Sequence, residues 1–343
     1  MKTLLNTLFV QTQGAYLRLD HDTLKVEVEG QVRLQVPLHH LGALVLFGDV
    51  MITPALIARC AADGRSLTWL SHSGRFRGRL EGPVAGNVLL RRAQHEALSQ
   101  KERTLEIARN MVAGKVKNLR TMVMRSARET EAAQEEKLLR GAASHLADIL
   151  RRLPTAPDLD TLRGLEGEAA HHYFGVFRHM ILSDRQTFSF AGRNRRPPLD
   201  PVNALLSFLY ALLLNDCVAA AQGVGLDPQV GFLHALRSGR PALGLDLMEE
   251  LRPVLADRLA LTLINRRQLT EKDFQHRPGG AVLLHDSGRK KVVVAYQERK
   301  QQEVTHPVAE RKMPLGLVPH IQARFLARHL RGDLAGYPPY VHH

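Results

Sequence analysis

The pattern of apolar residues changes character once along the chain, at the small-residue segment 82–87 (Gly-Pro-Val-Ala-Gly-Asn). Before it, apolar and polar residues alternate over residues 17–36, which is typical of half-buried antiparallel strands. After it, helix-forming residues dominate residues 88–152. We therefore predict an α+β chain with two domains, a β-rich domain over residues 1–84 and a mostly helical domain over residues 85–343.

Local signals add detail to the N-terminal domain. The apolar run Leu-Val-Leu-Phe at residues 44–47 suits a central strand. Thr53 followed by Pro54 predicts a helix start, because threonine caps a first turn that proline fits, and Gly64 predicts the end of that helix. Residues 66–70 are expected to form a further strand. These elements predict a small β-sandwich-like domain.

The helical domain carries three further signals. Gly114 predicts a break between a first helix and a second, charged helix that begins at Lys115. The apolar stretch within residues 201–220 predicts a buried central helix. Two short β-type runs, residues 281–285 and 291–296, flank the segment Asp-Ser-Gly-Arg-Lys and predict a short β-hairpin inside the otherwise helical domain.

The charge balance limits the class of partner. The chain has 47 Lys and Arg against 34 Asp and Glu, a formal net charge of +13 and a pI of about 10.1. Such an excess attracts a polyanion and releases condensed counterions on binding, so nucleic acid is the leading partner class. An anionic membrane is the alternative, but no run reaches the roughly 20 apolar residues that a spanning helix needs. We therefore expect no membrane partner.

Cysteine usage indicates the compartment. Only Cys60 and Cys217 are present, too few for a disulfide framework and without the spacing of a zinc site. The first residues do not build the apolar core of a signal peptide. We therefore expect a cytoplasmic protein.

Asp246 and Glu249 form a first candidate site. Their spacing places both carboxylates on one face of a helix, where they repel each other unless a cation compensates them. Mg²⁺, Mn²⁺ or an arginine would serve as that cation. The alternative is a solvated acidic helix face that Arg252 neutralises.

His234 lies upstream of this acidic pair. Gly239 and Pro241 break the chain between them, so that it turns back and the imidazole and the carboxylates can converge. The alternative is a satisfied core histidine, because Phe232 and Leu233 precede it.

Glu166 is a third candidate carboxylate. On a helix it lies on the protein-facing side with Tyr173, whereas Glu168 projects away. An inward carboxylate needs a partner, and a buried glutamate–arginine pair is the alternative to a functional role.

Taken jointly, Glu166, His234, Asp246 and Glu249 make a mixed oxygen and nitrogen ligand set that suits Mg²⁺ or Mn²⁺ and lacks the thiolates of zinc or iron–sulfur sites. Such a metal activates water or a 3′-hydroxyl and neutralises charge on a phosphorane-like transition state. No covalent protein nucleophile is then required.

Clusters of basic residues are candidates for contacts with backbone phosphates, because arginine and lysine position duplexes without reading bases. They are Arg193, Arg195 and Arg196 beside two prolines, Arg237 and Arg240 after His234, and Arg289, Lys290 and Lys291 at the tip of the predicted hairpin. For any one of them, simple solubility is the alternative.

Three motifs resemble those of the CRISPR-associated protein one family, the integrase-nucleases of spacer acquisition. The motifs are Gly-Leu-Glu166-Gly-Glu-Ala-Ala, Gly-Phe-Leu-His234 and Leu-Asp246-Leu-Met-Glu249-Glu-Leu-Arg-Pro. The resemblance covers nearly the whole chain. Residues 194–198, 201–207 and 306–312 look most like the type I-C branch.

The resemblance implies roles for these residues. Glu166, His234 and Glu249 fall on the family's metal ligands, with Asp246 as the adjacent acidic residue, and some relatives have aspartate in place of Glu249. The implied reaction is the attack of a 3′-hydroxyl of a short captured DNA on a phosphodiester at the leader–repeat boundary, with metal-dependent DNA cleavage as the related nuclease activity.

The resemblance also implies partners. It predicts double-stranded DNA, both spacer precursor and CRISPR repeat, as the substrate. It predicts a homodimer, with dimerisation through the N-terminal domain, that the CRISPR-associated protein two joins into a larger complex. Type I-C systems commonly add the CRISPR-associated protein four.

Two other functions remain open at this point. His285-Asp286 and His21-Asp22 have the form of the paired ligand of an HD-type phosphohydrolase, although both pairs fall in predicted turns rather than on a helix. A non-catalytic, basic DNA-binding architectural dimer is the third hypothesis, in which the acidic and histidine residues only satisfy one another.

Overall fold

The computed structural model describes residues 6–82, 88–194 and 197–342. The chain divides into two compact units, residues 1–85 and 86–343. Residues 83–87, in which the sequence predicts the linker, lie outside the described residues.

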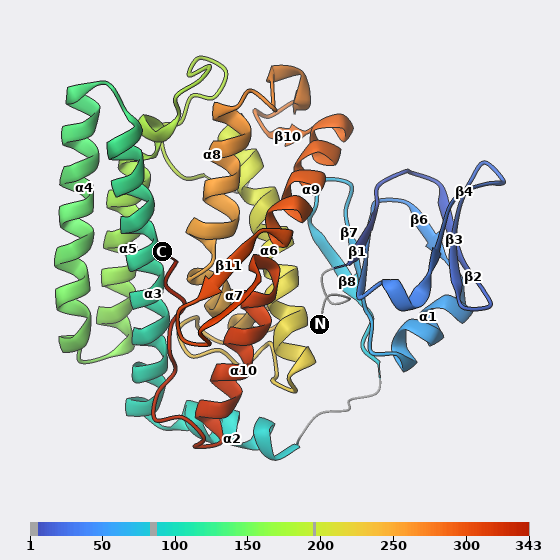
Figure 1. The fold of residues 1–343 in the computed structure, drawn as a ribbon, viewed down its shortest axis with the longest axis horizontal. Helices are drawn as coiled ribbons and strands as arrows, with labels where there is room; N and C mark the ends of the chain where they lie inside the picture. The colour runs from blue at the N-terminus through green and yellow to red at the C-terminus, as the bar shows by residue number, and fades with distance from the viewer. Residues whose placement is uncertain (1–5, 83–87, 195–196, 343) are drawn as a thin grey trace. The chain divides into compact units, whose positions relative to one another are not determined.

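The first unit contains two four-stranded sheets and one α-helix (Figure 1). Its elements are β1 (Thr7–Val10), β2 (Ala15–Asp20), β3 (Thr23–Val28), β4 (Gln31–Pro37), the 3-10 turn η2 (Leu38–His40), β5 (Ala43–Phe47), β6 (Val50–Ile52), α1 (Pro54–Ala62), β7 (Ser66–Leu70) and β8 (Phe76–Arg79). One sheet has the order β1-β5-β7-β8, with parallel pairs except β7–β8. The other has the order β4-β3-β2-β6, antiparallel except that β6 runs parallel to β2.

Both sheets share one apolar core. Leu17 and Leu24 of one sheet and Leu44 and Leu67 of the other are fully buried in it. Period-two alternation produces this burial, because every second side chain of a strand points to the same face. The antiparallel strands predicted within residues 17–36 are confirmed, as is the β-rich character of this unit.

Helix α1 begins as its sequence predicts. The Thr53 side chain accepts a hydrogen bond from the Leu56 amide at 3.4 Å, and Pro54 occupies the first turn, where no amide donor is needed. Gly64, just beyond the helix, has a φ of +64°, which glycine adopts without steric penalty.

The second unit is mostly helical. Its elements are α2 (Val88–Ser99), α3 (Lys101–Glu129), α4 (Ala133–Arg152), η3 (Leu153–Thr155), α5 (Leu159–Val176), η4 (Phe177–Met180), α6 (Pro201–Gly223), α7 (Ala242–Glu249), the π-helical turn η5 (Arg252–Asp257), α8 (Arg258–Asn265), η6 (Glu271–Asp273), β9 (Phe274–His276), β10 (Val282–Leu284), α9 (Asp286–Gln301), β11 (Glu303–His306), β12 (Arg311–Pro314), η7 (Leu315–Leu317) and α10 (Val318–Leu330). Helices α3, α4 and α5 pack side by side, and α3 also contacts α7 (Figure 1).

Helix α3 continues through Gly114, so the predicted break there is wrong. The chain breaks earlier, at Gln100, between α2 and α3. Gly114 serves close packing instead: a Cβ atom at this position would lie 2.9 Å from Cβ of Pro339 and 3.2 Å from Cγ of Glu250. The glycine therefore lets α3 approach the end of α7 and the C-terminal segment.

Helix α6 is the predicted buried central helix. By length and composition it would also pass for a membrane span, but 67% of its most apolar window is buried inside the protein. Asp200 caps it by accepting a hydrogen bond from the Asn203 amide at 2.7 Å. We interpret α6 as a core helix of the second unit.

The hairpin predicted over residues 281–296 is wrong. Strand β10 pairs antiparallel with the preceding strand β9, and Asp286–Gln301 form helix α9. Gly288 again marks a close approach rather than a turn, because a Cβ there would meet the backbone carbonyl of Asp273. A short β-hairpin does exist in this unit, formed by β11 and β12.

Gly114→Ala is expected to lower the free energy of unfolding by about 1 to 3 kcal/mol, because the added methyl group overpacks a filled contact. Gly141→Ala in α4 is the matched control: no atom lies within 4 Å of its Cβ position, so alanine should stabilise the helix by roughly 0.5 to 1 kcal/mol. Urea unfolding of both variants measures the effects, and equal stabilisation by the two would contradict the packing role of Gly114.

Candidate active site

Asp246 holds the His234 loop against helix α7. Its Oδ2 accepts hydrogen bonds from the Phe232 and Leu233 amides at 2.6 and 3.0 Å. Its Oδ1 contacts the His234 amide at 3.0 Å and Nδ1 of the His234 ring at 2.6 Å. The turn predicted at Gly239 and Pro241 is confirmed by this contact, and Gly239 has a φ of +70°. Asp246 thereby fixes the imidazole with Nε2 directed away from it.

The approach of the loop to α7 is close enough to require glycine. A Cβ at Gly231 would lie 2.6 Å from the Ala242 carbonyl carbon and 2.6 Å from Oδ2 of Asp246. On the other side, Nε of Arg163 in α5 donates a hydrogen bond to the Leu233 carbonyl at 2.8 Å. The position of the His234 loop is therefore set by α5 as well as by α7.

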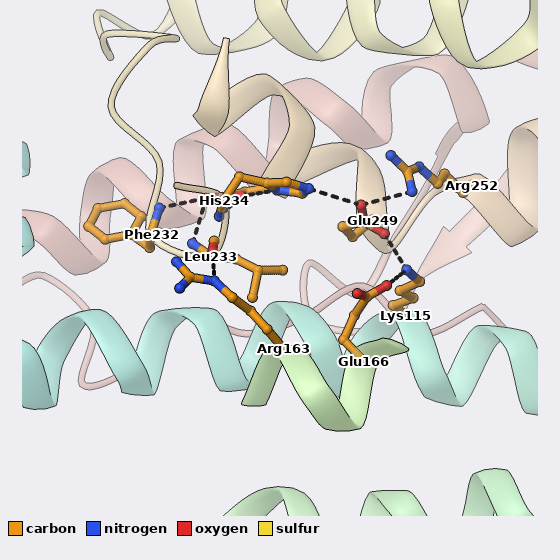
Figure 2. Close-up of polar contacts among 9 residues, drawn as sticks. Lys115, Arg163, Glu166, Phe232, Leu233, His234, Glu249 and Arg252 are labelled. Carbon is orange, nitrogen blue, oxygen red and sulfur yellow. Dashed lines mark hydrogen bonds and ion pairs between the residues drawn. The ribbon is translucent and has the colours of Figure 1, made fainter. Parts of the chain in front are cut away.

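Glu249 lies at the centre of the polar cluster in Figure 2. Nε2 of His234 lies 3.7 Å from its Oε1, Nη1 of Arg252 lies 2.9 Å from the same oxygen, and Nζ of Lys115 lies 2.6 Å from its Oε2. Burial would raise the pKa of this carboxyl, but the charges of Arg252 and Lys115 outweigh it and lower the pKa to about 2. Glu249 is therefore an ionised, buried carboxylate.

Lys115 joins Glu249 to the third candidate carboxylate. Its ammonium forms ion pairs with Glu166 of α5 and with Glu249 of α7 (Figure 2). The Lys115 side chain is 6% exposed, yet the two carboxylates outweigh the effect of burial and raise its pKa. Glu168 projects away, as predicted, and pairs with Arg152.

These residues line a cavity of about 750 Å³ within the second unit. Its polar lining includes Lys115, Glu166, His234, Arg240, Glu249 and Arg252. The four acidic and histidine candidates therefore converge. Glu166, His234 and Glu249 line the cavity, and Asp246 contacts the ring of His234.

A second polar group forms the other part of the cavity wall. The hydroxyls of Tyr210 and Tyr173 donate hydrogen bonds to Asp257 at 2.6 and 3.0 Å. Burial raises the pKa of Asp257 to about 6, although both hydroxyls act in the opposite direction. The guanidinium carbons of Arg252 and Arg193 lie 5.0 and 5.3 Å from the centre of the Tyr210 ring.

Glu250 follows Glu249 but is neutralised differently. It contacts the hydroxyl of Tyr337, accepts a hydrogen bond from Nε2 of Gln322 at 3.0 Å and accepts another from the Tyr340 amide. Burial raises its pKa to about 8 despite these donors. Glu250 is therefore a largely protonated acid at neutral pH that ties α7 to the C-terminal segment.

The basic residues predicted to contact phosphate fall in different environments. Arg240 lines the cavity, and Arg237 is exposed on the same loop. Arg193 also lines the cavity but donates hydrogen bonds to Asn203 and Ser207. Arg195 and Arg196 lie outside the described residues.

The remaining basic cluster does not form a hairpin tip. Arg289 is buried in the first turn of α9 and pairs with Asp286 at 2.5 Å, which corrects its predicted placement on the surface. Lys290 is exposed on the same helix, and Lys291 pairs with Asp273 at 2.8 Å. This segment therefore offers at most its two lysines to a phosphate backbone.

The paired ligands of the HD-type hypothesis do not gather further ligands. His285 occupies the N-cap position of α9 without a capping hydrogen bond from its side chain, and Asp286 pairs with Arg289. His21 lies in the turn after β2 and contacts Asp20 at 2.9 Å. Within the described parts of the chain, no group of three His, Cys, Asp or Glu side chains is arranged around either pair or around any other ion position.

The donor types of the candidate site nevertheless fit a hard divalent cation. An Nδ1–H donated to Asp246 leaves Nε2 of His234 with a lone pair, which faces a carboxylate oxygen of Glu249. Two acceptors face each other stably only with a proton or cation near them. The cation at that oxygen is the guanidinium of Arg252, and the ammonium of Lys115 pairs with the other oxygen of Glu249 and with Glu166.

The comparison with known proteins assigns the family. The family model of the CRISPR associated protein Cas1 matches residues 8–298. A "CRISPR-associated endonuclease Cas1 1" of Moorella thermoacetica is 59% identical and a "CRISPR-associated endonuclease Cas1 2" of Rhodospirillum rubrum is 55% identical, over 100% and 99% of both chains respectively. The chain belongs to the Cas1 family.

Solved structures confirm the fold. The Cas1 protein TM1797 of Thermotoga maritima is similar with a TM-score of 0.80 and 23% identity, over 95% of this chain and 97% of that one. A casposase bound to its integration product gives a TM-score of 0.81 at 21% identity, over 96% and 91%. A Cas6-RT-Cas1–Cas2 complex contains a chain that matches over 36% of its length, with a TM-score of 0.83 and 23% identity over 97% of this chain.

One relative joins two proteins in a single chain. A "CRISPR-associated exonuclease Cas4/endonuclease Cas1 fusion" of Geobacter sulfurreducens is 38% identical over 97% of this chain and 60% of its own length.

The sequence interpretation missed the role of Lys115. A detectable signal exists: Ala108, Met111, Leu119 and Met122 form the buried face of α3, and Lys115 occupies the same face. A lysine on an apolar helix face requires a buried acidic partner. Its partners, however, lie on other helices, and no local pattern identifies them.

The protonated state of Glu250 predicts a pH dependence of stability. The folded state retains a proton that the unfolded chain releases, since the pKa is raised from 4.5 to about 8. The resulting contribution is fully present below about pH 4.5 and is lost as pH rises to about 8, on the order of 3 kcal/mol or more.

Glu250→Gln should remove this pH dependence, because the amide stays neutral. Urea unfolding at pH 5 and pH 8 is expected to show a larger loss of stability at pH 8 for the wild type than for the variant. Subtracting the two profiles cancels the other titrating groups. Parallel profiles would contradict a protonated Glu250.

Proposed function

We propose that this protein is the metal-dependent DNA integrase and endonuclease of CRISPR adaptation. In the proposed reaction, the 3′-hydroxyl of a short DNA attacks a phosphodiester of the CRISPR array. A new phosphodiester forms, and the displaced 3′-oxygen leaves with a proton. The observation that carries the proposal is the convergence of Glu166, His234 and Glu249 on one cavity of a basic Cas1-family chain. The curated relatives are named endonucleases, and the similar casposase is bound to an integration product, which supports both activities.

The metal in this proposal is Mg²⁺ or Mn²⁺. Glu166, Nε2 of His234 and Glu249 would hold it, and their oxygen and imidazole donors suit these ions. When bound, the ion polarises the reacting phosphate and lowers the pKa of the attacking hydroxyl.

Other residues of the site prepare it for the reaction. Asp246 fixes the tautomer and orientation of His234 through Nδ1. Arg252 holds Glu249 and remains on the cavity wall. Arg240 on that wall and Arg237 on the adjoining exposed surface are positioned to contact the phosphates that flank the reacting one.

The proposed partners follow from the relatives. Double-stranded DNA, as spacer precursor and repeat, is the substrate, and the charge of +13 supports its binding. We propose a homodimer, formed through the N-terminal unit, that assembles with Cas2, because a similar chain occurs in a complex with Cas2. The fused relative supports Cas4 as a further partner. The assignment to the type I-C branch and to the cytoplasm belongs to the same proposal.

The architectural alternative draws on one observation. Lys115 and Arg252 already balance the charges of Glu166 and Glu249, so the cluster is satisfied without a metal. In that case the acidic residues would matter for stability but not for chemistry.

Glu166→Ala and His234→Ala are each expected to reduce Mn²⁺-dependent strand transfer more than about 100-fold, because residues that merely support metal ligands already contribute about 10- to 100-fold. DNA binding at moderate salt should stay largely intact. The matched control is Glu168→Ala, two residues along the same helix, whose side chain pairs with Arg152 at the surface. Unchanged strand transfer in a purified, folded Glu166→Ala protein would favour the architectural function.

Arg237→Ala is expected to weaken DNA binding and to reduce the slope of log affinity against log salt by about 1, because one phosphate contact and its released counterion are lost. Fluorescence anisotropy over a range of salt concentrations measures the slope. Arg331→Ala provides the control, because Arg331 is exposed, pairs with Asp333 at 2.7 Å and has no place in the cavity. A slope equal to that of the wild type would remove Arg237 from the DNA interface.

A further inference from the structure

Lys115 occupies an unusual position for a lysine. The residue is 5% exposed, and its ammonium lies between two carboxylates that come from two different helices. Lysine is almost never fully buried unless it is paired, and here the pair consists of two proposed metal ligands. A structural ion pair would need only one of them.

We propose that Lys115 is a resident counter-cation, which a divalent ion displaces and which then binds a DNA phosphate. One side chain would thereby couple metal binding to DNA binding. This inference rests on the proposed function, since it assumes that Glu166 and Glu249 bind the metal.

The contacts of Lys115 require the displacement. Its ammonium lies against Oε1 of Glu166 and Oε2 of Glu249, the oxygens that face each other across the space between α5 and α7. Oε2 of Glu249 is buried and has no aligned hydrogen-bond donor, so the ion pair is its main contact. An ion that takes both oxygens therefore takes the place of the ammonium.

Charge gives a second reason. Lys115 and Arg252 together match the two negative charges of Glu166 and Glu249. A divalent ion added beside them brings two further positive charges next to the ammonium in a largely buried site, where repulsion is poorly screened. The balance is restored when the ammonium leaves the carboxylates and a phosphate contributes negative charge.

The backbone of α3 cannot follow the ammonium. Gly114 lies against Pro339 and Glu250 so closely that even a methyl group does not fit, and Nδ2 of Asn118 donates hydrogen bonds to the carbonyls of Glu250 and Tyr340 at 2.8 and 2.9 Å. Movement is thus confined to the side chain of Lys115. It lines the same cavity as Arg240, where the proposed DNA phosphate lies.

The coupling has a thermodynamic signature. If DNA gives the displaced ammonium a new partner, then Mn²⁺ strengthens DNA binding and DNA strengthens Mn²⁺ binding by the same factor. Lys115 contributes part of this increase in affinity, and that part is lost when the charge of Lys115 is removed.

The experiment compares the full chain with Lys115→Met, which keeps most of the apolar stem and removes the charge. Mn²⁺ binding is measured by titration calorimetry without DNA, and again with a short duplex whose 3′ ends lack hydroxyls, so that no strand transfer occurs, and whose phosphates are replaced by phosphorothioates, which slows hydrolysis. Without DNA, Lys115→Met should bind Mn²⁺ at least about tenfold more tightly than the wild type, because no cation has to be displaced. The increase in Mn²⁺ affinity that DNA causes should be several-fold smaller in the variant.

Lys300→Met is the matched control. Lys300 is also buried and paired, with Asp216 at 2.8 Å, but it does not line the cavity. This variant should keep the wild-type Mn²⁺ affinity and DNA coupling even if it is less stable.

For Lys115→Arg we expect the opposite change in Mn²⁺ affinity. This variant tests the proposal if Lys115→Met does not fold. A guanidinium pairs with carboxylates in two parallel hydrogen bonds and is harder to displace, so Mn²⁺ binding should be weaker than in the wild type. Mn²⁺ affinity that is equal to or weaker than wild type in folded Lys115→Met, or unweakened in Lys115→Arg, would overturn the role of Lys115. Failure of the wild type to bind Mn²⁺, with or without DNA, would instead reject the proposed metal site itself.

Discussion

The arrangement of the second unit depends on how two adjacent buried glutamates are neutralised. Glu249 stays ionised because Lys115 of α3 and Arg252 of η5 both pair with it. Burial raises the pKa of Glu250 to about 8 and so favours its neutral form, and the Gln322 side chain and the Tyr340 amide donate hydrogen bonds to it. The end of α7 is thus held by ion pairs at Glu249 and by hydrogen bonds to a neutral carboxyl group at Glu250. A buried charge without a partner destabilises a fold by several kcal/mol. Loss of the ion pairs of Glu249 would therefore destabilise the end of α7, to which Glu250 is also attached.

The backbone around the cavity is held by packing and hydrogen bonds, whereas the charged side chains at the cavity are free to change their ionic partners. The helices that carry Glu166, Lys115 and Glu249 are held by contacts that involve no exchangeable ion, such as Gly114 against Pro339. Asp246 likewise holds the His234 loop through backbone amides. The cations Lys115, Arg240 and Arg252 and the carboxylates of Glu166 and Glu249 line the cavity. The proposed reaction would need such a preorganised frame, because small errors in the position of reacting groups reduce the rate strongly.

The sequence predicted those features that depend on neighbours along the chain. The threonine–proline pair before α1 and the turn between His234 and Asp246 are local, and both are confirmed. Gly114 and Gly288 were misinterpreted because glycine serves close approach as well as turns, and only the folded chain distinguishes the two uses. The partner of Lys115 on α5 lies 51 positions away, beyond the reach of any periodicity. The convergence of Glu166, His234 and Glu249 on one cavity was therefore predictable from the sequence, whereas the lysine that pairs with two of them was not.

The position of helix α6 in the chain affects how the protein folds during its synthesis. The elements that pack most against it, namely α7, η5, α8, β10 and α10, all follow it in the chain. During translation, the apolar α6 leaves the ribosome before any of these partners exists to cover it. The nascent chain therefore exposes a long apolar segment for an interval during its synthesis. We expect chaperones that bind apolar segments to increase the yield of folded protein.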